Sequence, residues 1–184
     1  ENINSTNPVV VGDIVEFVVE EHDLQEIGII QKIHDRRNYI LRKSVNLSKQ
    51  THILASNIDL LLLVITIKNP ITTTSFIDRF LVSAEAYSVK TILVFNKCDI
   101  YDKNDEILLN SLINIYHSIG YETIKTSTNS GKGIKELEKK ISNKTIIQNH
   151  NLLIAFIYNS DKVLDYKIIL DSILKILKKI RKGD

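Results

Sequence analysis

The chain has 184 residues, 43% of them hydrophobic and 25% charged, and a formal net charge of +2, which is ordinary for a globular protein of one or two domains. Its single cysteine, Cys98, excludes a disulfide framework or a cysteine-rich zinc site within these residues, and its longest apolar run, 60–65, is too short to span a membrane. No charged-then-apolar leader precedes the first strand, so we expect a cytoplasmic protein without membrane contact.

The first 49 residues predict a small β-barrel or part of one. After a polar start, 9–19 is typical of a strand interrupted by a turn at 12–13. The polar stretch 20–23 is typical of a loop, and 28–33 and 39–41 predict two more strands. Several short strands separated by polar turns favour a barrel-like β domain.

The segment 28–49 is strongly basic. It carries six basic side chains against one acidic residue, Asp35, a net charge of +5. Arginine and lysine neutralise phosphates, and an aromatic side chain can stack on a base, so the segment predicts an RNA-binding surface. A solvated hairpin face is the alternative interpretation. The candidate RNA-binding residues are Lys32, Arg36, Arg37, Tyr39, Arg42 and Lys43.

From residue 57 the pattern changes to alternating strands and helices, after a polar stretch, 44–56, that we interpret as a possible linker. The continuous apolar run at 60–65 is typical of a strand buried on both faces of a parallel sheet. The alternation continues to residue 141, which predicts a parallel α/β sheet. Its further predicted elements are helix 76–87, strand 91–95, helix 105–120, strand 122–125 and helix 134–141.

Helical spacing also predicts which face of the first two helices is buried. The first helix is expected to bury Phe76, Ile77, Phe80, Leu81, Ala84 and Tyr87. The second is expected to bury Ile107, Leu108, Leu112, Ile115 and Ile119. Beyond these helices, 152–158 predicts one more strand and 161–182 a closing amphipathic helix with a basic polar face. That face is interpreted as solvated, with RNA contact as the less favoured alternative.

The stretch 91–100 carries the most specific chemical signal. Its strand is followed directly by Asn96, Lys97, Cys98 and Asp99, an N-K-x-D tetrapeptide. Ligands of open α/β sheets bind beyond the carboxyl ends of the strands. A carboxylate placed there can accept hydrogen bonds from the N1–H and the exocyclic amino group of guanine, a donor pair that adenine lacks. The Asn96 amide can bridge the base and neighbouring loops, and the Lys97 stem can cover the base. The alternative is a surface turn that matches the N-K-x-D pattern by chance.

The order of these motifs resembles the circularly permuted GTPases, and specifically the RsgA (YjeQ) family. In an ordinary GTPase, N-K-x-D and the S-A-like loop that follows it come after the phosphate loop. Here they come first within the α/β domain, behind a basic β-rich segment. Residues 126–128 stand where the family carries the S-A-like loop, and 131–137 resembles the G-x-G-I-x-E-L start of the next helix. Further similar stretches are 11–15, 37–42, 50–59 and 77–85.

The resemblance implies an α/β permuted P-loop-GTPase-like parallel sheet with a partial N-terminal all-β OB-fold barrel and a C-terminal helix. The implied domains are an RNA-contacting barrel in 1–49, the base-recognition half of a permuted GTPase domain in 50–150, and a remnant ending in an amphipathic helix in 151–184. Guanine contact is carried over to Asn96, Lys97, Asp99, Thr126, Ser127 and Thr128.

The same resemblance implies cofactors and partners. It implies a monomer that binds GTP or GDP with Mg²⁺ and hydrolyses GTP during late maturation of the small (30S) ribosomal subunit, in contact with that subunit and its rRNA. It also implies a zinc-binding C-terminal domain.

The sequence departs from the family where phosphates and metals are bound. A phosphate loop needs G-x-x-x-x-G-K-[ST], but the one Gly-Lys pair, Gly131-Lys132, has Thr126 in place of the first glycine and Gly133 in place of the hydroxyl residue. None of the six glycines follows an aspartate by three residues, as a D-x-x-G switch requires. One cysteine cannot build the family's zinc site. No catalytic residue can therefore be nominated.

Two explanations of these departures stay open. The missing segments belong to the natural protein but lie outside these 184 residues, which the complete lack of methionine favours, or the protein is naturally degenerate. The first explanation predicts an RsgA-like GTPase, and the second predicts a non-hydrolysing RNA- or ribosome-binding module. A structural remnant without a ligand is a third, weaker possibility.

Overall fold

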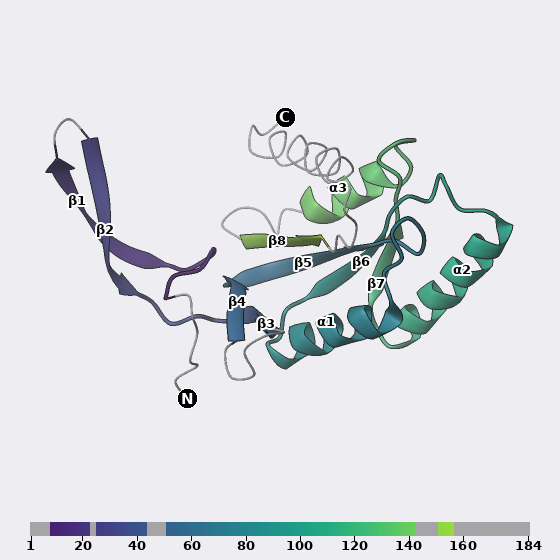
Figure 1. Ribbon diagram of the computed structural model, residues 1–184, viewed down its shortest axis with the longest axis horizontal. Coiled ribbons are helices and arrows are strands. Elements are labelled where there is room, and N and C mark those ends of the chain that lie inside the picture. The colour runs from purple at the N-terminus through teal and green to yellow at the C-terminus, as the bar shows by residue number, and fades with distance from the viewer. Residues whose placement is uncertain (1–7, 23–24, 44–50, 143–150, 157–184) are drawn as a thin grey trace.

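The computed structural model describes residues 8–22, 25–43, 51–142 and 151–156 (Figure 1). Its strands are β1 Val15–His22, β2 Gln25–Ile33, β3 Tyr39–Lys43, β4 Thr51–Ser56, β5 Ile58–Ile65, β6 Thr91–Phe95, β7 Glu122–Lys125 and β8 Asn151–Phe156. Its helices are α1 Thr74–Ala86, α2 Lys103–Ser118 and α3 Ile134–Ser142. The helix predicted at 161–182 and the last two residues of the strand predicted at 152–158 lie outside the described residues.

Four parallel strands form the central sheet in the order β7-β6-β5-β8. β5 lies in the interior of the sheet, since its run of apolar residues from Leu60 to Ile65 buries side chains on both faces. The chain moves outward from β5 to β7 and then returns to the other side of β5 as β8, so the strand order reverses between β5 and β8. The predicted parallel α/β sheet is therefore confirmed.

Helices cover the two faces of this sheet, with α3 on one side and α1 and α2 on the other (Figure 1). Alternate side chains of β5 supply the two cores, because successive residues of a strand point to opposite faces. The core under α1 and α2 contains Leu63, Ile65, Ile77, Leu81, Leu93, Phe95, Cys98, Leu109 and Tyr116. The core under α3 contains Leu60, Leu62, Val64, Ile92, Val94, Ile124, Leu137 and Ile141.

The buried face predicted for α1 is largely confirmed, whereas the face predicted for α2 is wrong. In α1, Ile77, Leu81 and Ala84 are buried. In α2 the buried residues are Leu109 and Tyr116, with two partly buried neighbours, Leu112 and Ile113, packed beside them. Four of the five predicted core residues of α2 are instead 50–69% exposed, namely Ile107, Leu108, Ile115 and Ile119. Apolar residues surround most of this helix, so its periodicity does not select one face.

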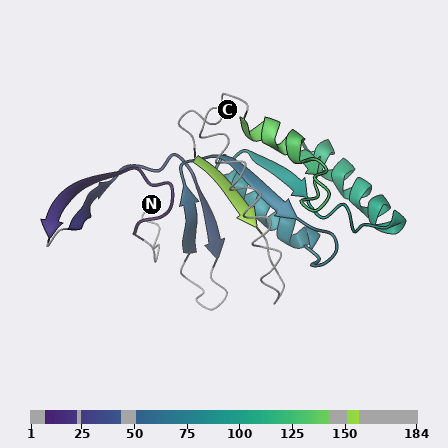
Figure 2. The same ribbon diagram turned by 90° about the horizontal axis from the view of Figure 1, so that it is seen from above.

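The four N-terminal strands form two antiparallel pairs, β1 with β2 and β3 with β4. Two sequence expectations are wrong here: 20–22 continues strand β1 instead of forming a loop, and 51–56 is strand β4 rather than linker. The turn at 12–13 is present, but 9–11 is not a strand. Figure 2 shows the β3–β4 pair between the β1–β2 hairpin and the parallel sheet. Within the described residues the two pairs are separate sheets.

A polar junction joins the N-terminal segment to the start of β5. The Arg36 guanidinium donates from two nitrogens to the Asp13 carboxylate at 2.7 Å, and the Ser56 hydroxyl donates to the same carboxylate at 2.6 Å. These donors, Arg36 first, lower the pKa of Asp13 to about 2. Close by, the Asn38 amide exchanges two hydrogen bonds with the backbone of Ile58. These contacts fix the position of the N-terminal β strands relative to the start of β5.

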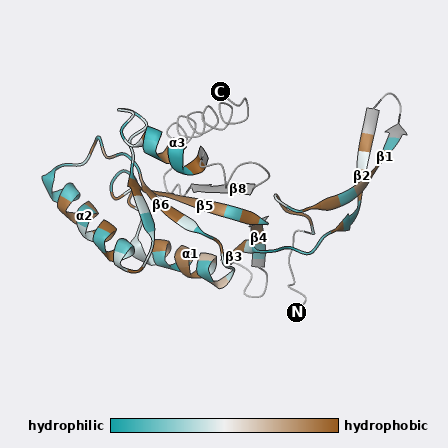
Figure 3. Ribbon diagram, turned by 180° about the vertical axis from the view of Figure 1, so that it is seen from behind, coloured by the Kyte–Doolittle hydropathy of each residue, from teal (hydrophilic) through white to brown (hydrophobic). Residues whose placement is uncertain are grey.

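The β1–β2 hairpin contains hydrophobic residues (Figure 3). On both of its strands apolar side chains are exposed, among them Phe17, Val19 and Ile29. The hairpin extends away from the parallel sheet (Figure 1). A lone two-stranded hairpin is only marginally stable in water. The hairpin would therefore gain stability if these apolar side chains packed against another surface. Among the described residues, no helix is both long enough and apolar enough to cross a lipid bilayer.

Candidate nucleotide-binding site

Two loops meet beyond the carboxyl ends of β6 and β7. Because these strands are parallel neighbours, residues 96–99 after β6 and 126–133 after β7 emerge at the same edge of the sheet. The backbone joins them directly: Cys98 N–H donates to the Thr126 carbonyl at 3.0 Å, and Thr126 N–H donates to the Phe95 carbonyl at 2.7 Å. The N-K-x-D tetrapeptide and the predicted S-A-like loop are therefore brought together.

Asn96 is buried between the two loops. Its side-chain oxygen accepts a hydrogen bond from the Thr126 hydroxyl at 3.1 Å, and both residues are 2% exposed. Its backbone carbonyl accepts a hydrogen bond from the Tyr101 hydroxyl at 2.5 Å. That hydroxyl also accepts from the Ile67 N–H at 3.2 Å. Burial raises the pKa of Tyr101 to about 12, so the phenol stays protonated and tied to both groups at neutral pH.

Asp99 lies at the open side of the site. One of its carboxylate oxygens accepts from the Ser127 hydroxyl at 2.5 Å, and the other accepts from the Asn129 amide at 3.1 Å. These hydrogen bonds, above all the one from Ser127, lower the pKa of Asp99, so the carboxylate is charged at neutral pH. Asp99 is exposed whereas Ser127 is fully buried. The buried Ser127 hydroxyl therefore holds the carboxylate on its protein side, and its other side is accessible from solvent.

Lys97 has a left-handed backbone conformation, with φ +65°, which is uncommon for a residue other than glycine. Its ammonium group donates to the Asn69 carbonyl at 2.6 Å, in the loop that follows β5. Such conformations persist where the surrounding structure holds them, often at binding sites. The ammonium contact spans from the end of β6 to the loop after β5.

The loop after β7 is shaped by its own backbone. Ser127 N–H donates to the Lys132 carbonyl at 2.9 Å, and Ser130 N–H donates to the Ser127 hydroxyl at 3.1 Å. Gly133 has φ +71°, and a Cβ there would lie 1.9 Å from the Lys125 carbonyl oxygen. Only glycine fits this approach of the two backbones. The half-buried Thr128 completes the predicted set of base-contacting residues at this loop.

This arrangement suits a base with an N–H donor pair next to a carbonyl. A charged carboxylate only accepts hydrogen bonds, and Asp99 presents two such oxygens on one open side. Guanine carries adjacent N1–H and amino donors, whereas adenine has an unprotonated nitrogen at the same place. Guanine contact by Asn96 and Asp99 stays a prediction, and the two loops place both side chains at the same edge of the sheet.

The predicted RNA-binding residues whose side chains the structure describes differ in how available their charges are. Arg36 is 19% exposed and bound to Asp13 in the polar junction. Lys32 is well exposed but forms an ion pair with Glu16 at 3.0 Å. The side chains of Arg42 and Lys43 lie outside the described part of the chain.

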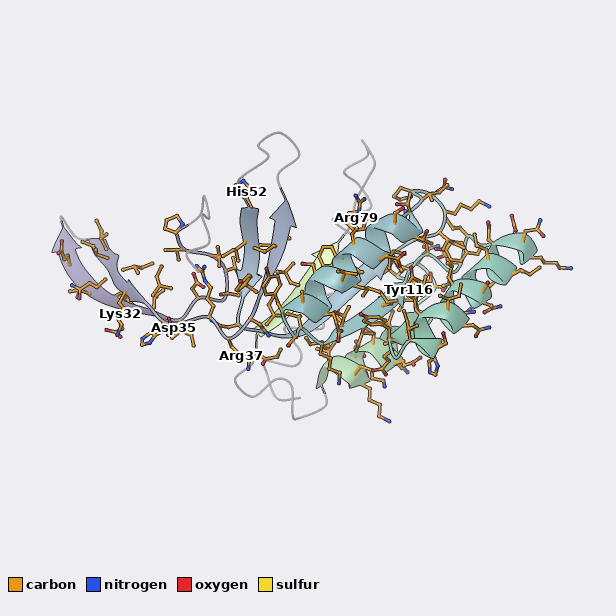
Figure 4. The ribbon with its side chains drawn as sticks, turned by 90° about the horizontal axis from the view of Figure 1, so that it is seen from below. Lys32, Asp35, Arg37, His52, Arg79 and Tyr116 are labelled. Carbon is orange, nitrogen blue, oxygen red and sulfur yellow. The ribbon has the colours of Figure 1, made fainter. Side chains whose placement is uncertain are left out.

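Arg37 and Tyr39 occupy different surroundings from one another. Arg37 is 58% exposed and pairs with Asp59. The Tyr39 ring packs against Tyr87 with the ring centroids 4.2 Å apart, so it contributes to the contact between β3 and the end of α1. Figure 4 shows Lys32 and Arg37 on one side of the molecule and His52 on the opposite side. Among the candidates with described side chains, Lys32 and Arg37 are the most exposed, at 61% and 58%.

The described residues do not fit the zinc that the family implies. Among them, no group of three or more histidine, cysteine, aspartate or glutamate side chains could hold a metal ion. Cys98 is buried, its thiol donates to the Phe95 carbonyl at 3.3 Å, and burial raises its pKa. This thiol is a packing group of the core under α1 and α2.

Sequence reasoning missed two residues of the site. Asn129 reaches Asp99, and Tyr101 links the Asn96 carbonyl to the loop after β5. The sequence offers only a weak signal for Asn129, which is that a polar residue follows the end of a predicted strand. No local pattern marks Tyr101, because its role depends on how two loops pack.

The chain matches the family model described as RsgA GTPase over residues 33–148. It is 53% identical over 154 residues to the protein named small ribosomal subunit biogenesis GTPase RsgA of Flavobacterium psychrophilum, covering 82% of this chain and 47% of that protein. It is 48% identical over 152 residues to the protein of the same name in Porphyromonas gingivalis, covering 82% and 48%. The chain thus spans about half the length of these curated relatives.

Two solved structures are also similar. The crystal structure of YjeQ from Thermotoga maritima is 31% identical, with a TM-score of 0.62, over 90% of this chain and 51% of that one. YloQ, described as a circularly permuted GTPase, is 25% identical with a TM-score of 0.50, over 82% of this chain and 46% of that one. The fold of this chain is therefore similar to about half of each of these two structures.

Proposed function

Because the chain belongs to the RsgA GTPase family, we propose that it binds guanine nucleotides and serves the biogenesis of the small ribosomal subunit. The single observation that carries this proposal is the pair of cross-loop contacts, Thr126 to Asn96 and Ser127 to Asp99. They hold an amide and a carboxylate at the edge where three strand ends meet. The proposed base-contacting residues are Asn96, Lys97, Asp99, Thr126, Ser127 and Thr128.

The proposed roles follow the three segments of the chain. Residues 50–150 are the base-recognition half of a permuted GTPase domain, and 151–184 are a remnant of the GTPase or C-terminal domain. Residues 1–49 are the RNA-contacting part, a partial OB-fold barrel in which Lys32 and Arg37 are the most exposed of the described candidates. We propose a cytoplasmic monomer whose RNA partner is the small-subunit rRNA.

The family's reaction is GTP hydrolysis with Mg²⁺, and the described residues contribute base recognition to it. Mg²⁺ supplies charge neutralisation between phosphates when it is bound. In this chain the side chains of Asn96 and Asp99 orient the base, and Lys97 covers one edge of it. The strand order reverses between β5 and β8, and in α/β sheets such a reversal is where the phosphates of a nucleotide lie.

A second candidate function is a ribosome- or RNA-binding module that does not hydrolyse GTP. The observation favouring it is that none of the six glycines in the 184 residues belongs to a phosphate-loop sequence or a D-x-x-G switch. In this case the basic segment 28–49 carries the function, and binding depends on salt because counterions are released from the RNA.

One experiment separates the two functions. The protein is incubated with purified small ribosomal subunits, Mg²⁺ and GTP, GDP or ATP, and both subunit binding by sedimentation and phosphate release are measured. The GTPase predicts phosphate release from GTP but not ATP, raised by subunits. The module predicts sedimentation with subunits that falls with salt and is the same with each nucleotide, without phosphate release. Absence of both subunit binding and phosphate release contradicts both functions.

A further inference from the structure

Both carboxylate oxygens of Asp99 already have donors in the nucleotide-free site. The Ser127 hydroxyl donates a hydrogen bond to one oxygen. The Asn129 side-chain amide donates to the other oxygen at 3.1 Å. Because a charged carboxylate only accepts, the amide must face it with its nitrogen. The question is which of these donors remains when a base arrives.

The two donors differ in how firmly they are held. Ser127 is fully buried, its hydroxyl also accepts from the Ser130 N–H, and its own N–H binds the Lys132 carbonyl. Asn129 is exposed, and Asp99 is exposed beside it. Moving the Ser127 hydroxyl would leave a buried polar group without its partner, whereas an exposed asparagine amide exchanges its partner for water at small cost. Asn129 is therefore the donor that can leave.

The Asn129 amide and the amino group of guanine are chemically alike. Both are planar NH₂ groups that donate to an oxygen acceptor. We propose that Asn129 occupies the Asp99 oxygen that the guanine amino group needs, so that base entry exchanges one N–H donor for another and Asn129 sets the affinity for guanine. This inference rests on the proposed guanine site and adds a residue that regulates it.

The exchange has a consequence for selectivity. Guanine replaces the hydrogen bond that it displaces, so its entry leaves the Asp99 carboxylate satisfied. Adenine lacks donors at this edge and cannot replace the Asn129 amide, so its entry would strand the charged carboxylate. Asn129 thereby lowers the affinity for every base, and guanine stays preferred because it supplies a new donor to Asp99 whereas adenine does not.

The test compares Asn129→Ala with wild-type protein and with a matched control, Asn114→Ala. Asn114 is an exposed asparagine near the far end of α2. The Kd for GMP is measured from backbone amide chemical shifts. This method detects the weak binding that is expected when a protein contacts the base but has no phosphate loop to bind the phosphate. Asn129→Ala is expected to lower this Kd about threefold to tenfold, the range given by the net value of one hydrogen bond. Asn114→Ala is expected to leave it unchanged.

A second readout needs no nucleotide. The pKa of the Asp99 carboxyl is measured from its ¹³C chemical shift in wild-type protein and in Asn129→Ala, and it is expected to rise when the amide donor is lost. An unchanged pKa, or an unchanged or raised Kd for GMP in Asn129→Ala, overturns the inference alone. Failure of wild-type protein and Asn129→Ala alike to bind GMP overturns the proposed guanine site and the inference with it, even where the pKa of Asp99 has moved.

Discussion

The hydroxyl of Thr126 and the side-chain oxygen of Asn96 are joined by a hydrogen bond of 3.1 Å that crosses between the ends of two neighbouring strands. Both residues are buried, so neither atom has water as a ready substitute. The bond fixes the amide of Asn96 with respect to the loop that carries Ser127. One hydroxyl thus connects the two motifs that were recognised separately in the sequence.

Replacing Thr126 by valine removes this hydroxyl while keeping the shape of the side chain. We expect Thr126→Val to lower the free energy of unfolding by about 1–3 kcal/mol, because the buried oxygen of Asn96 loses a donor. Urea unfolding measures the loss. Thr123→Val is the control, since Thr123 lies half-buried on β7, the strand that ends directly before Thr126. Equal losses in both variants would show that the Thr126 hydroxyl has no special role.

Exchanging the Asp99 carboxylate for an amide should change which base is preferred. An asparagine amide offers a donor to the C2 carbonyl of xanthine, whereas it opposes the C2 amino group of guanine with a second donor. We expect Asp99→Asn to weaken GMP binding roughly tenfold or more and to favour XMP over GMP. The measurement is a pair of NMR titrations, with Asp35→Asn as the control variant. An unchanged preference for GMP would remove Asp99 from the site.

Two glycines in the same loop should differ in their tolerance of a methyl group. Gly131 and Gly133 have similar φ angles, +76° and +71°, but a Cβ at Gly131 meets nothing within 4 Å. A Cβ at Gly133 would lie 1.9 Å from the Lys125 carbonyl oxygen. We expect Gly131→Ala to cost about 1 kcal/mol for its backbone conformation alone and Gly133→Ala at least about 2 kcal/mol more. Similar unfolding free energies for the two variants would contradict the close approach.

The Asp13–Arg36 ion pair should make stability depend on pH in the acid range. The pKa of Asp13 is lowered from 3.8 to about 2 in the folded protein, chiefly by its hydrogen bonds from Arg36. The stabilisation is therefore complete above the unfolded pKa and is lost as pH falls toward 2. We expect the difference in unfolding free energy between wild-type protein and Asp13→Asn to shrink by about 1 kcal/mol from pH 6 to pH 3. A pH-independent difference would contradict the lowered pKa.

Two neighbouring arginines should separate RNA binding from stability. Arg37 is largely exposed, whereas Arg36 is committed to Asp13. We expect Arg37→Ala to weaken binding to small-subunit RNA about twofold to fivefold at low salt and to lower the unfolding free energy by about 1 kcal/mol, because the Arg37 side chain is 58% exposed while its partner Asp59 is 16% exposed. Arg36→Ala should instead lower the unfolding free energy by about 3 kcal/mol, because it leaves the Asp13 carboxylate buried and unpaired. RNA affinity that Arg37→Ala leaves unchanged would contradict its role.

The interior of the central sheet was predictable because β5 and β6 are short apolar runs with polar residues at their ends. The bounds of β6 and β7 agree with the prediction, and β5 is two residues longer at its start. The buried face of α2 was not predictable, because Leu109 and Tyr116 face the sheet while equally apolar residues such as Ile107 remain exposed. Strand β4 was missed because 51–56 looks polar overall, although Ile53 and Ala55 alternate inward. Packing between elements decided both cases.

The candidate site was predictable only for those residues that belong to a recognisable sequence motif. N-K-x-D at a strand end and the following threonine–serine pair identified Asn96, Asp99 and Ser127, and the fold places them together. Asn129 and Tyr101 were missed, because their contacts arise only when separate loops meet. The Arg36 side chain looked available for RNA in the sequence and is committed to Asp13 in the structure, a pairing 23 residues apart that local charge counting cannot detect.

The central claim is that the two loops beyond β6 and β7 read guanine. The most direct measurement is the change in backbone amide chemical shifts of ¹⁵N-labelled protein on addition of GMP or AMP at equal concentrations. If these loops read guanine, GMP causes saturable shifts confined to 96–99, 126–133 and their neighbours, and AMP causes none there. Equal shifts with both nucleotides, or no shift at these residues with GMP, would contradict it.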